Sequence, residues 1–220
     1  FDVNGDADDG CECEFISASD DPFDGIDANC DGRDGDPEDA VYVNGVLGSA
    51  TGTGEIDDPL DSIQDGIDLA NTSGLEFVVV SIGKYTENVS LVDGVNVFGG
   101  YDLDFDERDP ALYTSSIKGS ASPTLLASKI ISETTFDGFE VLGPTVAAAG
   151  GDSIAVWIED SDSDFTFSNN EVVAGNGVNG TSGPDGGDGT DGSDGGDGVD
   201  GGFANCSSLP AGGLGGANAC

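Results

Sequence analysis

The sequence predicts an all-β parallel β-helix, a solenoid in which short strands stack coil upon coil. One pattern, at residues 92–99 (VDGVNVFG), returns at 136–143 (FDGFEVLG) and more loosely at 167–174 (FSNNEVVA). Each copy has a bulky residue, a turn pair and then alternating apolar and polar positions, which is typical of a strand with one buried face. Because the copies are unevenly spaced, loops of different length must leave the coils.

The alternation within each copy predicts which side chains enter the core. Asn170 takes the place that Phe139 has in the previous copy. It either hydrogen-bonds along a ladder of turn amides or faces solvent. The residues expected to point inward are Val95, Val97, Phe139, Val141 and Val172.

Further short strands are expected between and around these copies. The continuous apolar run at 77–82 (FVVVSI) favours a strand that is buried on both faces. Residues 103–110 (LDFDERDP) read as a polar excursion. The other expected strands are residues 116–119, 124–128, 129–132 and 154–158, the last containing Trp157.

A short helix is expected near residue 60. Asp58 can cap a helix whose first residue is Pro59. Such a helix could cover the open N-terminal end of the solenoid, which would otherwise invite pairing with other chains. The residues that then share one helix face are Leu60, Ile63, Ile67 and Ala70.

The chain is strongly acidic. Asp and Glu total 44 against 5 Lys plus Arg, which gives a formal charge of −39. Such a surface repels DNA, RNA and anionic lipid, and it repels itself unless cations neutralise it. A solvated acidic surface, as in salt-adapted proteins, is one reading. Because the acids cluster in patterned loops, we favour specific binding of divalent cations, above all Ca²⁺, which prefers hard oxygen ligands.

The chain has no His and 5 Cys, and both counts limit the kinds of metal and catalytic site that it can form. Without His, the commonest transition-metal ligand and the Ser-His-Asp and Cys-His arrangements are excluded. Cysteines in Gly- and Asp-rich loops suit an oxidising compartment, and an odd count leaves one thiol free or paired with another chain. Neither a signal peptide nor an 18-residue apolar run is visible, so we expect no membrane insertion and read Phe1 as the start of a processed segment.

The first acidic loop, residues 2–13 (DVNGDADDGCEC), places oxygen-bearing side chains at alternate positions, as calcium loops of the EF-hand type do. Ala7 stands where the sharp turn needs Gly, Cys13 stands where a bidentate Glu would close the shell, and no amphipathic helices flank the loop. The sequence therefore predicts a looser Ca²⁺ loop rather than an EF-hand. Its expected ligands are Asp2, Asn4, Asp6 and Asp8.

The second acidic loop, residues 23–36 (FDGIDANCDGRDGD), is spaced by glycines and could wrap an ion without helix or strand support. A disordered acidic linker is the alternative. A disulfide from Cys30 to Cys11 or Cys13 would tie the two loops together and argue against disorder. The expected ligands are Asp24, Asp27, Asn29, Asp31, Asp34 and Asp36.

This second loop resembles the Asp-rich metal-binding motif of secreted bacterial proteins, many from myxobacteria and their relatives. There the motif precedes a right-handed parallel β-helix of the pectin-lyase-like superfamily, although Phe23 replaces a Cys that is frequent in that motif. The resemblance continues through residues 40–44 (AVYVN), 52–70 (GTGEIDDPLDSIQDGIDLA) and 83–102 (GKYTENVSLVDGVNVFGGYD). It implies a right-handed solenoid and a secreted protein. It implies little about activity, because the superfamily includes lyases, hydrolases, adhesins and inert stalks.

From Gly177 to Gly201, glycine occupies every third position, and Asp precedes it in the later triplets. A three-residue period matches polyproline-II geometry, which would set the Asp residues in one row at intervals of about 9 Å. The segment is expected either to pack as such a strand, with residues 210–217 folding back, or to be a flexible linker. Cys206 and Cys220 could close a small loop here. The expected domains are residues 1–38 (metal-binding loops), 39–174 (β-helix) and 175–220 (Gly-rich segment).

Catalysis is not expected. The superfamily's lyases use an Arg or Lys base beside carboxylate-bound Ca²⁺, but only Lys118 and Lys129 lie near predicted coils here, and no acidic cluster accompanies them. Its hydrolases use paired aspartates on adjacent coils, whereas the Asp-Asp pairs at residues 8–9, 20–21 and 57–58 fall outside the coils. The remaining Lys and Arg residues are Arg33, Lys84 and Arg108.

The sequence thus predicts a non-catalytic, Ca²⁺-binding β-helix protein, secreted or exposed on a cell surface, with a structural or adhesive role. Its expected partners are divalent cations, with further copies of itself or surface glycans as candidates, and neither nucleic acid nor a membrane. Carbohydrate binding or a polysaccharide lyase on the solenoid face are the alternatives.

Overall fold

The computed structural model describes residues 13–18, 20, 28–30 and 37–197. The chain forms two compact units, residues 1–181 and residues 182–220. All helices and strands of the described part belong to the first unit. In chain order they are η1 (Pro37–Asp39), β1 (Ala40–Val43), α1 (Ile63–Ser73), β2 (Phe77–Ser81), β3 (Gly83–Tyr85), β4 (Val89–Ser90), β5 (Asn96–Tyr101), β6 (Ser115–Lys118), β7 (Leu125–Ser128), β8 (Thr134–Asp137), β9 (Phe139–Leu142), β10 (Val156–Glu159), β11 (Phe165–Ser168) and β12 (Glu171–Val173).

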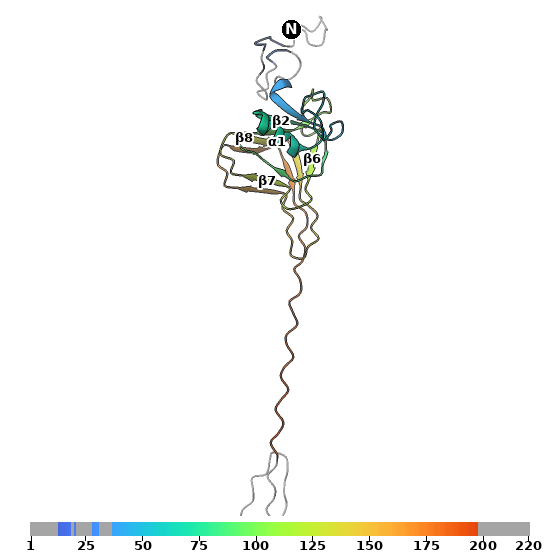
Figure 1. The fold of residues 1–220 in the computed structure, drawn as a ribbon, viewed down its shortest axis with the longest axis vertical. Coiled ribbons are helices and arrows are strands. Elements are labelled where there is room, and N and C mark those ends of the chain that lie inside the picture. The colour runs from blue at the N-terminus through green and yellow to red at the C-terminus, as the bar shows by residue number, and fades with distance from the viewer. Residues whose placement is uncertain (1–12, 19, 21–27, 31–36, 198–220) are drawn as a thin grey trace, which may run out of the picture. The chain divides into compact units, whose positions relative to one another are not determined.

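The strands form three parallel sheets. The sheet orders are β1-β2-β5-β8-β11, β10-β7-β4 and β12-β9-β6-β3. From β2 onward, successive strands therefore visit the five-stranded, the four-stranded and the three-stranded sheet in a fixed cyclic order. Figure 1 labels one strand of each sheet, β2, β6 and β7, and the single helix α1.

The register of the sheets stacks apolar side chains into rows. In the five-stranded sheet, Val78 lies beside Val97, Val97 beside Phe136, and Phe136 beside Phe167. The rings of Phe136 and Phe167 stack at 5.7 Å between centroids. Each inward side chain is thus covered by those of the coils before and after it, and full burial of one such side chain contributes roughly 1.5–3 kcal/mol.

Helix α1 covers the N-terminal side of this core, but it begins later than the sequence predicts. It runs from Ile63 to Ser73, with Ser62 as its N-cap and its buried face at Ile63, Gly66, Ile67 and Ala70. The expected start at Asp58 and Pro59 is wrong, because the Asp58 carboxylate accepts from Thr53 N in a preceding turn. Leu60 is buried, but it precedes the helix.

The later start has a long-range cause. Glu87, in the turn between β3 and β4, accepts from the backbone N–H groups of Ile63 and Gln64 at 2.9 Å each. The Ser62 hydroxyl also donates to this carboxylate at 3.1 Å. Glu87 therefore satisfies N–H groups that the first turn of a helix leaves without a partner, and its negative charge suits the positive end of the helix dipole.

The second and third copies of the sequence pattern, residues 136–143 and 167–174, pair in the register that their alignment predicts. Val141 lies beside Val172, and Phe136 beside Phe167. The first copy is misplaced by that alignment, because Val97 pairs with Phe136 rather than with Val141. Each corner of a coil needs a turn followed by a strand, so the local pattern alone does not reveal which side of the coil a copy occupies.

Most of the expected inward residues are buried. Val95, Val97, Phe139 and Val141 all belong to the core. Val172 continues the row of Val141, yet its side chain is 46% exposed, because β12 is an edge strand of its sheet. The expected strand at residues 129–132 is also wrong, since Lys129 has φ +60° and the chain turns there.

At the coarser level the fold prediction holds: the described chain is mostly parallel strands in three sheets, with one short helix. This arrangement is compatible with a parallel β-helix, and the right-handed winding stays a prediction. Among the described residues, no helix is both long enough and apolar enough to cross a membrane.

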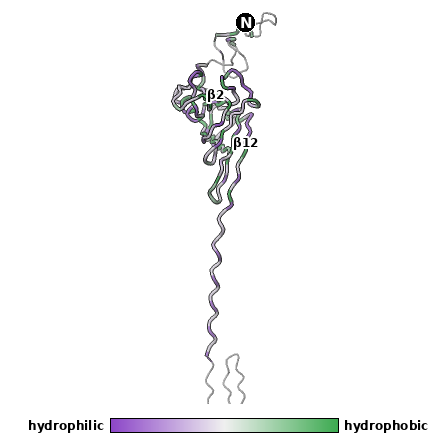
Figure 2. The backbone as a smooth tube through the Cα atoms, turned by 90° about the vertical axis from the view of Figure 1, so that its right-hand side faces the viewer, coloured by the Kyte–Doolittle hydropathy of each residue, from purple (hydrophilic) through white to green (hydrophobic). Residues whose placement is uncertain are grey.

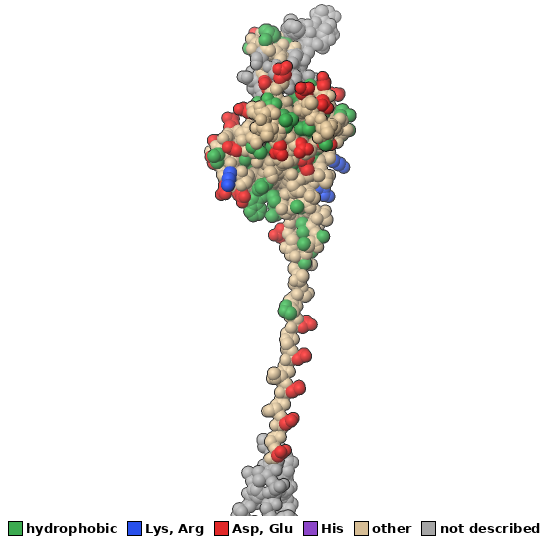
Figure 3. All heavy atoms as spheres, viewed as in Figure 1, with side chains coloured by type: hydrophobic (Ala, Val, Ile, Leu, Met, Phe, Trp, Pro, Cys, Tyr) green, Lys and Arg blue, Asp and Glu red, His purple; other side chains and the backbone are tan. Residues whose placement is uncertain are grey.

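Residues 182–197 begin the second unit and carry neither helix nor strand. Their backbone is coloured mostly from white to purple in Figure 2, which reflects a lack of apolar side chains. The acidic side chains of this segment lie along one side of it (Figure 3), as a three-residue period predicts. Such a row of carboxylates repels itself unless it meets water or cations.

We predict that Glu87→Ala lowers the free energy of unfolding by about 1 kcal/mol, the usual cost of losing an N-terminal cap. The loss follows because the Ile63 and Gln64 N–H groups would have no carboxylate partner. Denaturant unfolding followed by circular dichroism measures it. The matched control is Glu133→Ala, at an exposed loop position. Equal stability of both variants would show that Glu87 does not cap α1.

Candidate functional site

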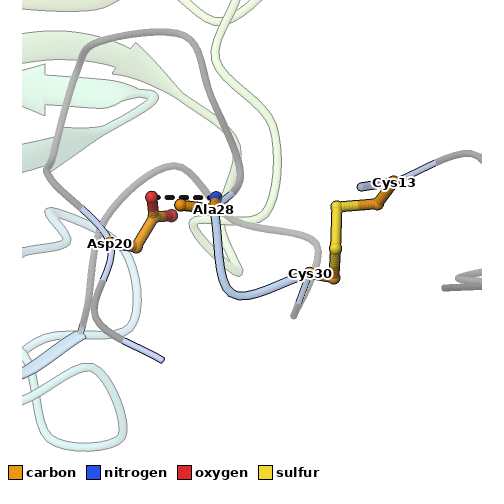
Figure 4. The surroundings of a disulfide bond; sticks show 4 residues. All are labelled: Cys13, Asp20, Ala28 and Cys30. Carbon is orange, nitrogen blue, oxygen red and sulfur yellow. Dashed lines mark hydrogen bonds between the residues drawn. A yellow bond between two sulfur atoms is a disulfide. The ribbon is translucent and has the colours of Figure 1, made fainter. Parts of the chain in front are cut away.

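The two acidic loops are joined near the N-terminus. Cys13 and Cys30 form a disulfide, which selects one of the two pairings that the sequence leaves open for Cys30. The backbone N–H groups of Ile16 and Ser17 both donate to the Ala28 carbonyl, at 2.9 and 3.1 Å. The segment that follows the first loop is therefore held against the middle of the second. Figure 4 shows the disulfide together with Ala28 and Asp20.

Of the ten predicted metal ligands, only Asn29 belongs to the described residues. It lies between Ala28, whose carbonyl accepts these bonds, and Cys30, which has a φ of +60°. Within the part of the chain that the structure describes, no three Asp, Glu, His or Cys side chains gather as a metal site requires. The other predicted ligands lie outside the described residues: Asp2, Asn4, Asp6, Asp8, Asp24, Asp27, Asp31, Asp34 and Asp36.

Asp20 is an organising carboxylate that the sequence does not single out as a ligand. Its side chain is 1% exposed and accepts from Ala28 N at 3.0 Å (Figure 4). A buried carboxylate needs hydrogen-bond donors. Asp20 therefore holds the backbone of the second loop in place at Ala28, close to the disulfide. Its role here is to stabilise the loop conformation.

An ion pair joins Arg108 and Asp137. The side chains are 28% and 6% exposed, and the guanidinium Nη2 contacts Asp137 Oδ1. Arg108 Nε also donates to the Gly99 carbonyl at 3.0 Å, and its guanidinium lies over the rings of Phe98 and Tyr101. Arg108 thus connects the loop after β5 to strands of two successive coils.

Asp137 extends this connection to the next coil. Its Oδ2 accepts from Ser168 Oγ at 2.6 Å and from Asn169 Nδ2 at 2.7 Å. Burial opposes ionisation of Asp137, but the hydrogen bonds from Ser168 and Arg108, together with the Arg108 charge, outweigh it and lower its pKa. With its donors in place, this carboxylate stays ionised and acts as a lock between coils.

Other carboxylates and amides lock the coils at their turns. Asp93 accepts from the backbone N–H groups of Ile131 and Ser132, and these bonds lower its pKa. Asn170 accepts from Phe139 N at 2.9 Å and donates to the Phe136 carbonyl at 2.9 Å. Asn170 therefore bonds to the turn of the neighbouring coil, as one of its two expected roles requires.

The described cations other than Arg108 are the lysines. Lys84 and Lys118 are exposed on β3 and β6, and Lys129 lies in a turn whose N–H donates to the Glu159 carbonyl. Lys118 lines a hollow with Leu142, Val146, Val173 and Asn176, among others. No Asp or Glu lines this hollow, so its side chains offer one cation (Lys118), one amide (Asn176), one hydroxyl (Thr145) and otherwise apolar groups.

Sequence reasoning missed the Arg108–Asp137 lock, because the 103–110 segment read as a polar excursion. In the structure this loop packs on the sheet, and Phe105 is buried with its ring 4.9 Å from that of Tyr42. Two local signals were available: Arg108 is one of only 5 Lys plus Arg, and Phe105 is an aromatic residue in an acidic loop. A scarce cation in an acidic chain is a candidate for a buried pair.

Comparison with known proteins adds no identity: no protein-family model, no curated protein and no solved structure matches the chain.

We predict that Asp137→Asn destabilises the protein by about 3 kcal/mol at pH 7, the lower end of the range for breaking a buried ion pair. The pKa of Asp137 is lowered from its ordinary value of 3.8. Its stabilising effect is therefore complete above pH 3.8 and is lost as the pH falls through the lower, folded-state pKa. The difference in stability between wild type and variant should shrink as the pH falls below 3.8, as measured by thermal unfolding.

The control for this experiment is Asp188→Asn, which removes one carboxylate from the second unit and leaves the lock intact. If the wild type and Asp137→Asn differed by the same amount at all pH values, the ionised lock would be refuted.

Proposed function

We propose that the chain is a non-catalytic, calcium-binding β-helix protein that acts outside the cell or on its surface, in a structural or adhesive role. The observation that carries the proposal is the Cys13–Cys30 disulfide, which joins the two acidic loops beside a stacked-strand body. Disulfides persist in oxidising compartments, and this one joins described residues that lie in neither a helix nor a strand.

The solenoid architecture is supported by the order of the strands. From β2 to β12 the chain passes through the three sheets cyclically, and each strand pairs in parallel with the strand three positions later. A polypeptide that winds around a central core has this order, because each turn adds one strand to every face. We infer a right-handed winding, since connections between parallel strands strongly favour that hand.

Calcium binding is supported by charge and by the chemistry of the loops. A formal charge of −39 destabilises a compact state through self-repulsion, and bound divalent cations relieve it. Carboxylate and amide oxygens separated by glycines are the ligands that Ca²⁺ takes in flexible loops. Asp20 and the disulfide brace the same region. The loops would thus fold around the ion at the point where they are cross-linked.

A structural rather than catalytic role is supported by the use of the scarce cations. Arg108 is held by Asp137 and by two aromatic rings, so it is not available as a base. Lys84 and Lys118 are exposed on their strands, and in the described part of the chain no three Asp, Glu, His or Cys side chains gather beside them as a metal site requires.

We predict that Ca²⁺ raises the melting temperature of the full chain and that a chelator reverses the effect. At free Ca²⁺ one hundred times the dissociation constant, the gain in stability is about 2.7 kcal/mol. Thermal unfolding in Ca²⁺ and in chelator measures the gain, and isothermal titration calorimetry gives the stoichiometry. The double variant Asp31→Asn/Asp34→Asn should weaken binding, because it removes two predicted ligands.

The matched control is Asp185→Asn/Asp188→Asn, which removes the same charge from the triplet segment. Equal weakening by both double variants would mean that Ca²⁺ neutralises charge without a defined site. Identical melting curves in Ca²⁺ and in chelator would refute the calcium proposal altogether.

A further inference from the structure

The two ends of the stacked sheets differ. At the N-terminal end, the outer edge of β1 is already occupied: Tyr42 N donates to the Gly54 carbonyl, Asn44 N to the Leu60 carbonyl, and Leu60 N to the Tyr42 carbonyl. Helix α1 packs over the same end with its buried face. At the other end, β10, β11 and β12 are the edge strands of the three sheets. Among the described residues, no strand pairs with their outer edges.

The backbone of β10 is oriented to receive another strand. Leu125 N donates to the Ala155 carbonyl, and Lys129 N donates to the Glu159 carbonyl. The backbone polar groups of Ala155 and Glu159 are therefore directed toward β7. In a parallel pair, alternate residues direct their N–H and C=O groups to opposite sides. Val156 and Ile158 therefore direct theirs away from the sheet. The same reasoning applies to Val172 in β12, because Gly143 N donates to the Val173 carbonyl.

The side chains at this edge are also incomplete in their packing. Ile158 lies beside Ala127, and Val172 beside Val141, and both of these partners are fully buried. Yet Ile158 is 49% exposed and Val172 is 46% exposed, although they occupy core positions of the stack. Free edge amides and half-covered core side chains at the same residues are what a further coil would use.

The charge at this edge indicates what the further coil carries. Five carboxylates surround the edge strands, and all of them are exposed: Glu159, Asp160, Asp162, Asp164 and Glu171. A second copy would bring the same carboxylates and repel, and this chain has only 5 Lys plus Arg with which to match them. Charge complementarity therefore favours a basic segment from a different polypeptide.

We propose that the edge formed by β10, β11 and β12 binds an extended segment of another protein, with alternating apolar residues and basic residues at its turns, by parallel strand addition. This inference rests on the proposed solenoid winding, and it is independent of calcium. The apolar residues of the segment would cover Ile158 and Val172, its backbone would pair with the outward amides of β10, and its basic residues would meet the five carboxylates.

The probe is a synthetic peptide with the sequence of residues 154–173, in which Trp157→Phe removes the chromophore and Lys replaces each of the five acidic residues. The protein has 1 Trp, Trp157, which lies on β10 and is 45% exposed. Its fluorescence therefore reports on this edge directly. We expect a saturable blue shift with the full chain, together with slower hydrogen exchange of the Val156 and Ile158 amides.

Two controls separate strand addition from charge attraction. A scrambled peptide of the same composition keeps the charge and loses the alternation, and it should produce no saturable shift. The variant Ile158→Pro removes an outward N–H without removing a bond to β7, and it should weaken binding at least tenfold, whereas Ile158→Val should bind as wild type does. If Ile158→Pro does not fold, Ile158→Glu provides the same comparison.

The proposal is overturned if the scrambled peptide binds equally, or if no saturable shift occurs. It is also overturned if sedimentation shows that the edge is occupied by a second copy of the chain. None of these results affects the calcium proposal, because that proposal is tested by a separate measurement, thermal unfolding in Ca²⁺ and in chelator.

Discussion

The structure depends on one constraint: the inward side chains of each strand must stack in register on those of the neighbouring parallel strands of the same sheet. Val97, Phe136 and Phe167 illustrate this, since they occupy one row through three successive strands of one sheet. A shift of one residue would turn the whole apolar set of a strand outward. The parallel register is therefore the quantity that the sequence must encode most strictly, and the three sheets share it.

The chain has only 5 Lys plus Arg, so few of its carboxylates can form ion pairs. Hydrogen bonds to carboxylates stabilise the turns between its strands instead. Asp93 and Asp137 accept from backbone or side-chain donors of a neighbouring coil, and Glu87 does the same for helix α1. Arg108 is placed where one cation serves three features at once: the Gly99 carbonyl, the Asp137 carboxylate and two aromatic rings. Carboxylates that would otherwise repel one another thus become braces of the fold.

Features that depend on neighbouring residues could be predicted from the sequence, whereas contacts between residues far apart in the chain could not. Alternation identified Val97, Phe139 and Val141 as core residues, because side-chain direction follows from strand periodicity alone. It could not place residues 92–99 on the correct side of the coil, because every corner has the same turn-and-strand pattern. The helix start depends on Glu87, which is 25 residues from Ser62. Of the predicted calcium ligands, only Asn29 lies in the described residues, where its neighbours are braced by Asp20 and by the disulfide.

The asymmetry of the two ends follows from the same constraint, since in a stack of parallel strands every strand has two neighbours except the outermost ones. The most direct test is therefore of the register itself. In β8 and β11, Thr135 lies opposite Thr166. Neighbouring strands lie about 4.8 Å apart, within reach of a disulfide. The variant Thr135→Cys/Thr166→Cys should oxidise to a cross-link that peptide mapping by mass spectrometry detects. If that pair stayed reduced while Thr135→Cys/Ser168→Cys formed the cross-link, the stacked register would be wrong.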